Sequence, residues 1–234
     1  MRNDQYLVKK IKMHIRDIST SDLELLDVID TVINEIAVET RMFKKLFGFT
    51  VHKDIDQYNF MYIARMNEQV EMEPTFIEIN PLEPLEIIEF INKGEFPDVT
   101  VDKNLMKEEA ESRFIGLLDL FNEEGYSVLD KFEERGSSYY FCYDEQWRKA
   151  NDYKRFAMAS YVVPNISELN PELMNMILPA LIAGCKFYFY DTMHSPDDVQ
   201  ATNYDFMRWH QAKENLVNLY PTNTFSTKEL TRWL

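Results

Sequence analysis

The last third of the chain, residues 160–219, most constrains what this sequence can fold into. Asn170-Pro171 is a strong helix start, because Asn is a good N-cap and Pro fits the first helical position, where no amide partner is lost. A long apolar helix follows, and Pro179 inside it predicts a kink. Ser195-Pro196 then starts a second long helix. This stretch therefore predicts a pair of long helices near the C-terminus.

A second helical region lies near the N-terminus. Residues 5–17 place apolar side chains at helical spacing and predict a short amphipathic helix. Ser21 and Glu24 then form the pattern of a capping box. An apolar stripe continues from there at helical spacing through Leu26, Ile29, Ile33, Ile36, Phe43 and Phe47. We therefore predict a helix of about 26 residues with Gly48 as its left-handed C-cap.

The middle of the chain carries shorter and more mixed patterns. Strands are expected at 58–63, 75–79, 139–143 and 156–163, a short helix at 85–91, and a longer helix at 105–124 that Gly125 ends. The 139–143 and 156–163 strands are expected to share one small sheet. The predicted fold class is mainly α with a small antiparallel β element (α+β), a helical-bundle core of long helices and an acidic α/β insertion.

The expected organisation has four parts. These are residues 1–67, the N-terminal helices and first strand of the core; 68–135, the acidic insertion; 136–219, the small sheet and C-terminal helical pair; and 220–234, a C-terminal arm.

Charge is concentrated in the middle of the chain. The formal net charge is −15, and residues 68–135 hold 19 acidic and 6 basic side chains, whereas the flanks are nearly neutral. Such a field repels nucleic acid phosphates, which need Lys and Arg partners. Direct readout of DNA or RNA is therefore not expected.

No catalytic, cofactor-binding or metal-binding motif is present in the sequence. The four histidines do not form an HExxH pattern, and the one-turn spacing of His210 and Glu214 is better explained as a surface pair. Cys142 and Cys185 fit no metal or redox spacing and read as buried thiols. With six glycines in all, little backbone is free to cradle a phosphate. We expect a protein that is not an enzyme and has no cofactor.

The sequence also predicts neither a leader nor a membrane partner. The start of the chain lacks the apolar stretch of a signal peptide, and no uninterrupted apolar run approaches the roughly 20 residues of a membrane helix. We expect synthesis in the cytoplasm.

Two groups of large side chains suggest protein contacts. The consecutive rings Phe187, Tyr188, Phe189 and Tyr190 surround a whole helical turn, so one face can enter the core while the others need a partner. Packing inside a large monomer and an obligate subunit interface both fit this run. The polar C-terminal arm carries isolated anchors, a usual design for docking on another protein. These anchors are Phe225, Leu230, Trp233 and Leu234.

The arrangement resembles the head-to-tail connector, or portal-adaptor, proteins of tailed bacteriophages, with the tail tubular proteins of short-tailed phages as the nearest subgroup. The resemblance is carried by the capped helix over 27–36, the small sheet, Leu169 to Leu173 at the start of a helix, and a closing helix at 204–219. A small-residue patch follows the helix start, at Ala180, Ala183 and Gly184. The likeness covers about residues 20–65 and 156–219.

This resemblance implies a structural subunit of the virion, located at the head-tail junction. It implies a homo-oligomeric ring, a dodecamer in that family, beneath the portal protein and above the next tail or nozzle protein, through which DNA passes during ejection. Residues 222–234 would then contact the portal, and the helices around 29–36 and 173–190 would make ring contacts. Glu108, Glu109 and Glu111 are candidate acids of the DNA channel or of the outer surface. The alternative is an acidic DNA mimic, or another protein-binding module, that acts on a host protein.

Overall fold

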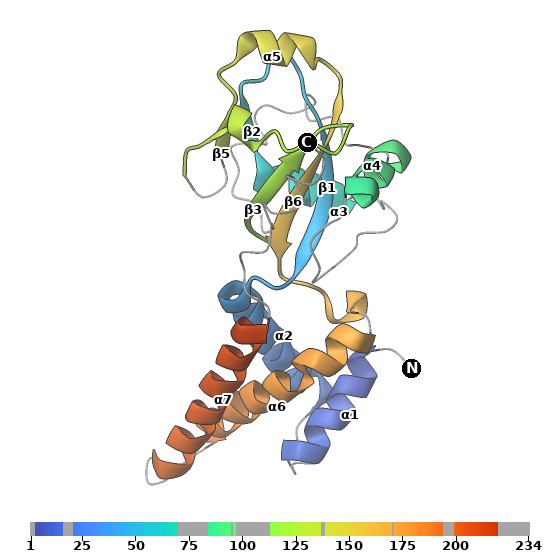
Figure 1. Cartoon of the computed structure of the whole chain (residues 1–234). Helices are drawn as coiled ribbons and strands as arrows, with labels where there is room; N and C mark the ends of the chain where they lie inside the picture. Colours follow the sequence, from blue (N-terminus) through green and yellow to red (C-terminus); the bar gives the residue numbers. More distant parts are fainter. Residues whose placement is uncertain are drawn as a thin grey trace. The chain divides into compact units, whose positions relative to one another are not determined.

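The computed structural model describes residues 3–15, 21–69, 84–94, 96, 113–136, 139–169, 171–193 and 199–219. The chain divides into two compact units, which we call the helical unit (Met1–Met42 with Val163–Leu234) and the sheet unit (Phe43–Val162). The described residues form seven α-helices and two three-stranded antiparallel sheets (Figure 1). The α+β class is confirmed. The unit boundaries differ from the expected divisions at 67/68 and 135/136.

The helical unit is built from both ends of the chain. Its elements are α1 (Asn3–Ile15), α2 (Asp22–Thr40), the short 3-10 helix η4 (Ile166–Glu168), α6 (Pro171–Met193) and α7 (Val199–Leu219). α6 packs against α1, α2 and α7, and Figure 1 shows it between α1 and α7 with α2 behind. The predicted helix start at Pro171 is confirmed, whereas Asn170 and 194–198 lie outside the described residues.

The predicted N-terminal helix α2 begins correctly but ends early. Its capping box is present, with the Ser21 hydroxyl accepting from the Glu24 amide and the Glu24 carboxylate accepting from the Ser21 amide. The helix ends at Thr40, because Arg41 is left-handed (φ 49°) and its N–H donates to the Ala37 carbonyl. The prediction of a helix to Phe47 is therefore wrong. Residues 45–49 form a strand that is buried on both faces, so its apolar spacing does not distinguish it from a helix.

Three helices meet closely at Gly184 of α6. A Cβ atom there would lie 2.6 Å from Val32 Cγ1 of α2 and 3.1 Å from the Trp209 ring of α7. Any side chain would force these helices apart. The small-residue patch of the sequence therefore serves close packing inside the helical unit.

A buried lysine joins α7 to α2. Lys213 is 8% exposed, and its Nζ lies 3.4 Å from Glu35 and 2.5 Å from Glu39. The same ammonium lies 4.7 Å from the centre of the Trp209 ring. Burial of a charge is tolerated only where partners compensate for lost water, and here two carboxylates and an aromatic face do so.

The sheet unit contains two small sheets and short helices. One sheet has the order β1 (Lys44–Thr50), β6 (Arg155–Val162), β3 (Phe114–Phe121), and the other the order β2 (Gln57–Asn59), β5 (Tyr139–Phe141), β4 (Glu133–Glu134). Its helices are α3 (Phe60–Gln69), α4 (Pro84–Lys93), the 3-10 helix η3 (Leu129–Lys131) and α5 (Glu145–Ala150). The expected strands near 139–143 and 156–163 both exist, but they belong to different sheets.

The first and last strands of the sheet unit are neighbours. β1 and β6 pair antiparallel along their whole length, and the Val162 N–H donates to the Phe43 carbonyl at 3.1 Å. The chain therefore enters and leaves this unit at the same end of one sheet. Such a unit can be inserted into the helical unit without separating α2 from η4 in space.

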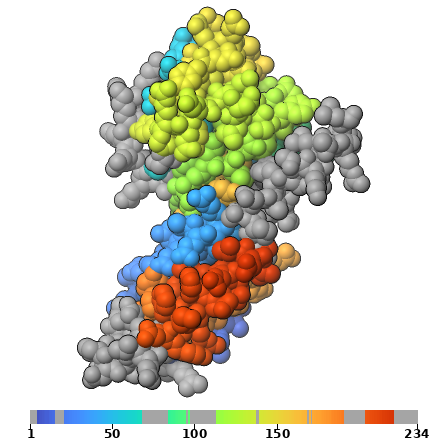
Figure 2. All heavy atoms as spheres, turned by 60° about the vertical axis from the view of Figure 1, so that its left-hand side comes forward, coloured from blue at the N-terminus to red at the C-terminus, as the bar shows by residue number. Residues whose placement is uncertain are grey.

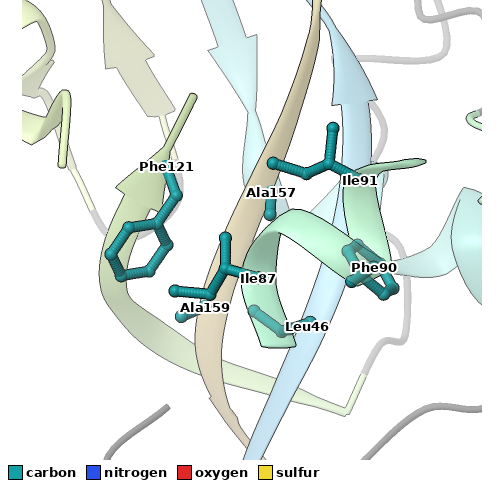
Figure 3. Packing of buried hydrophobic residues seen from close by; sticks show 7 residues of the cluster. All are labelled: Leu46, Ile87, Phe90, Ile91, Phe121, Ala157 and Ala159. Atoms are coloured by element: carbon teal, nitrogen blue, oxygen red, sulfur yellow. The ribbon is translucent and has the colours of Figure 1, made fainter. Parts of the chain in front are cut away.

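One face of the first sheet is covered by α4. Its apolar side chains point at β1 and β6, as Figure 3 shows. The cluster consists of Leu46, Ile87, Phe90, Ile91, Phe121, Ala157 and Ala159. Gly48 lies in β1 and is therefore not the predicted helix cap. A Cβ atom at this position would lie 1.9 Å from the Phe96 ring. This glycine admits an aromatic ring against the strand.

The alternate side chains of β1 and β6 enter an aromatic core shared with the second sheet. The Phe49 ring lies 5.7 Å from Phe156, 5.8 Å from Tyr58 and 5.6 Å from Phe60. Phe60 in turn lies 4.7 Å from Tyr140 of β5. Ring contacts of this kind stabilise the packing of the two sheets by more than the burial of apolar area alone.

Two further predictions in the middle of the chain are corrected. The expected strand at 58–63 is β2 followed by α3, which begins where the Asn59 side chain accepts from the Tyr62 amide. The expected helix at 105–124 is the strand β3 over its described part. Two register shifts in β3 break the period of two, so its apolar residues fall at helical spacing. Residues 75–79 and 105–112 lie outside the described residues, and the expected helix at 85–91 is confirmed as α4.

Asn67 of α3 closes the outer edge of β1. Its side-chain oxygen accepts from the Gly48 N–H, and its amide donates to the Gly48 and Ile63 carbonyls, all at 2.8 Å. Asn67 is 5% exposed. The side chain therefore satisfies backbone groups that water does not reach.

We predict that Asn67→Ala lowers the free energy of unfolding by about 2–3 kcal/mol, because buried N–H and C=O groups lose their partners. Urea denaturation followed by tryptophan fluorescence measures the change. Asn34→Ala, at an exposed position of α2, is the control. A loss below about 0.5 kcal/mol for Asn67→Ala would contradict this role.

For the lysine of α7, we predict that Glu35→Ala with Glu39→Ala is more destabilising than Lys213→Met. The double variant leaves an ammonium buried without acceptors, at a cost of about 2–3 kcal/mol. Lys213→Met instead leaves two carboxylates whose side chains are 32% and 45% exposed and can be hydrated. Denaturant unfolding of the variants gives the ranking. The reverse order would show that the two carboxylates do not compensate for the burial of the lysine.

Candidate functional site

The exposed apolar surface of the helical unit is concentrated on α7. Tyr204, Phe206 and Met207 are 61%, 47% and 64% exposed. Among the described side chains of α7, those of Trp209, Lys213 and Leu216 are buried, and Figure 2 shows the helix at the surface. Large apolar side chains gathered on one exposed helix are typical of a contact surface.

Four aromatic rings form a continuous chain across α6 and α7. Phe187 lies 5.2 Å from Tyr188 and 5.6 Å from Phe206, and the Phe206 ring stacks on His210 at 6.1 Å with an interplanar angle of 5°. The His210 Nε2 lies 3.7 Å from a Glu214 oxygen. We call Phe187, Tyr188, Phe206 and His210 the aromatic cluster.

The structure divides the aromatic run that the sequence singled out. Phe187 and Tyr188 are half-buried and belong to the cluster, whereas Phe189 is 7% exposed and belongs to the core of its own unit. The Tyr190 side chain lies outside the described residues. Sequence reasoning missed Phe206, although its spacing of four from His210 places both rings on one helix face.

The other residues proposed for contacts lie outside the described part of the chain. These are the arm anchors Phe225, Leu230, Trp233 and Leu234 and the acids Glu108, Glu109 and Glu111. Their roles stay predictions.

The two thiols are buried in the cores. Cys142 and Cys185 are both free and fully covered. Burial raises the pKa of both, that of Cys185 to about 12. Because the thiolate is the reactive form, neither cysteine has the environment of a nucleophile.

Asp119 of β3 is the carboxyl group whose surroundings most resemble those of a catalytic acid. Its pKa is raised by burial, against hydrogen bonds from the Ser127 hydroxyl at 2.6 Å and the Leu120 N–H at 2.7 Å. The Val128 N–H donates to the Leu120 carbonyl beside it. These contacts close the turn after β3, so a structural role accounts for Asp119.

Within the described ranges, no group of three or more His, Cys, Asp or Glu side chains could hold a metal ion. The expected absence of a cofactor and of enzymatic activity stays a prediction.

One helix among the described residues is long and apolar enough to cross a membrane. It is α6 over Pro171–Phe189, with a mean hydropathy of 1.2 and 44% of that window buried inside the fold. The core helix of a soluble protein meets the same criteria, and α6 packs against three other helices. The expectation of no membrane partner stays a prediction.

Comparison with known proteins found no matching family model and no matching curated protein.

We predict that Asp119→Asn weakens the pH dependence of stability. Because burial raises the pKa of this carboxyl in the folded state, the unfolded chain loses its proton first, at the ordinary value of 3.8, and the contribution of Asp119 to wild-type stability falls as pH rises above that value. Asn does not titrate, and its side-chain oxygen still accepts from Ser127.

Urea midpoints from about pH 3.5 to about pH 7 test this prediction. The loss of stability over this pH range should be smaller in Asp119→Asn than in the wild type. The exposed control Asp54→Asn should show the same loss as the wild type. Equal slopes in all three proteins would contradict it.

Proposed function

We propose that this chain is a structural connector subunit of a tailed phage, which forms a ring under the portal, joins capsid to tail and lets DNA pass. The observation that carries the proposal is the aromatic cluster, a chain of four rings at the surface of a helical unit.

The energetics of the cluster favour a protein partner. Aromatic residues are enriched at the centres of interfaces, where they fill pockets and exclude water. Phe206 is 47% exposed and already held by two neighbouring rings, so little side-chain entropy remains to be lost on binding. The cluster is therefore preorganised for contact with another subunit.

The finer architecture belongs to this proposal. The helical unit would be the helical core of the connector subunit, made by α2 near one end of the chain and α6 and α7 near the other. The sheet unit would be the acidic insertion, since it holds 24 acidic and 14 basic side chains. The C-terminal arm, residues 222–234, would contact the portal.

Charge gives this proposal a physical rationale. A ring of ~12 copies would carry on the order of −180 charges, and an acidic channel wall repels duplex DNA, so DNA passes without sticking. The alternative, an acidic DNA mimic, requires a monomer or dimer that binds a basic host protein. Mass in solution separates the two proposals.

The experiment measures the mass of the full chain by light scattering, alone and with the portal protein of the same virus. We expect a ring, or a complex with the portal protein that is lost on deletion of 222–234. Phe187→Ser with Phe206→Ser should weaken association between copies, because both rings would leave the interface. Tyr126→Ser, at a 65% exposed aromatic position of the sheet unit, is the matched control.

A chain that remains at 27.9 kDa with and without the portal protein would rule out the connector. A monomer that instead binds a basic protein would favour the DNA mimic.

A further inference from the structure

α1 is a positively charged helix in an acidic protein. Between Asn3 and Ile15 it carries Lys9, Lys10 and Lys12 against one acid, although the whole chain has a formal net charge of −15. Its buried side consists of Leu7, Val8, Ile11 and Ile15. Lys9 and the 69% exposed Met13 lie one turn apart on the side away from that core. The outer face of α1 is therefore basic, with one large apolar side chain on it.

α2 has the opposite character. It carries six acids and no Lys or Arg between Asp22 and Thr40. A stripe at helical spacing lies on its exposed side, formed by Leu23, Asp27, Asp30, Asn34 and Val38. Leu23 and Val38 are 72% and 50% exposed. The outer face of α2 is therefore acidic in its middle and apolar at both ends.

Association between copies of this chain faces a general electrostatic penalty. Both units are net acidic, with 16 acidic and 11 basic side chains in the helical unit and a larger excess in the sheet unit. Copies that approach at random repel one another, so a stable contact needs a place where positive meets negative. Within one chain Lys12 already pairs with Asp22, which shows that the two charge patterns can engage. Lys9 and Asp27 are also exposed and are not part of this pair.

We propose that the basic face of α1 on one copy docks on the acidic face of α2 on the next copy. Met13 would meet the apolar ends of the stripe at Leu23 or Val38, and Lys9 and Lys10 would face Asp27. The two surfaces differ, so the contact is heterologous, and repetition of a heterologous contact closes into a ring when the rotation allows. This inference rests on the proposed function and names the surfaces that would build the ring.

The test reverses each face separately in the full chain. Lys9→Glu with Lys10→Glu makes α1 acidic, and Asp27→Lys with Asn34→Lys makes the α2 stripe basic. Each variant should associate at least ~10-fold more weakly than the wild type, because like charges then face each other. Lys93→Glu with Lys154→Glu, at exposed positions of the sheet unit, makes the same change in net charge as the α1 variant and is its control. Thermal unfolding checks that every variant is folded.

Mixing the two face variants decides whether the surfaces meet between copies. The acidic α1 of one variant can pair with the basic α2 of the other, and the basic α1 of the second with the acidic α2 of the first. Native mass spectrometry should therefore find an assembly of the two in equal numbers, although each alone is dissociated. If the substitutions act only within each chain, mixing the variants would not restore association.

The outcomes separate this inference from the proposed function. A wild-type assembly that survives both reversals overturns the α1–α2 contact and leaves the connector standing. A mixed complex that stops at a dimer supports the contact and contradicts the ring. A wild-type chain that is monomeric at every concentration overturns both.

Discussion

The contact at Gly184 is the constraint on which the helical unit depends. Val32 lies in the first part of the chain and Trp209 near its end, and the absent side chain at 184 lets both approach α6. Close packing of this kind is sensitive to a single methyl group, because interiors have few voids to absorb it. Lys213 reinforces the same junction through Glu35 and Glu39. Helices from the N-terminal and C-terminal parts of the chain are thus packed together. The residues between them must therefore leave the helical unit and return to it.

The sheet unit satisfies that requirement through the pairing of β1 with β6. Because its first and last strands are hydrogen-bonded neighbours, the unit returns the chain to where it began. Asn67 then covers the outer edge of β1 with a side chain that binds both backbone groups of Gly48. At Gly48 the edge strand therefore does not offer its backbone groups for pairing with another chain.

The surfaces of the helical unit differ in chemistry. The aromatic cluster on α6 and α7 supplies apolar area that is already ordered, whereas the lysines of α1 and the acids of α2 supply charges of opposite sign. Apolar area contributes affinity, and charge complementarity contributes orientation and rejection of wrong partners. The proposed contact between copies would use both.

Local signals in the sequence were enough to predict the starts of α2 and α6, the helix α4 and the buried thiols, because caps, proline positions and apolar periods act within a few residues. They failed at β1 and β3, where burial on both faces and two register shifts produce the apolar spacing of a helix. Phe187 was visible in the sequence, but its neighbour Phe206 comes from another helix. The sequence by itself determined the α+β class and the starts of α2 and α6. Only tertiary structure decided that both end segments of the chain share one unit, that Gly48 and Gly184 serve close packing, and that Phe189 is core while Phe187 joins the aromatic cluster, because each depends on contacts between residues far apart in the chain.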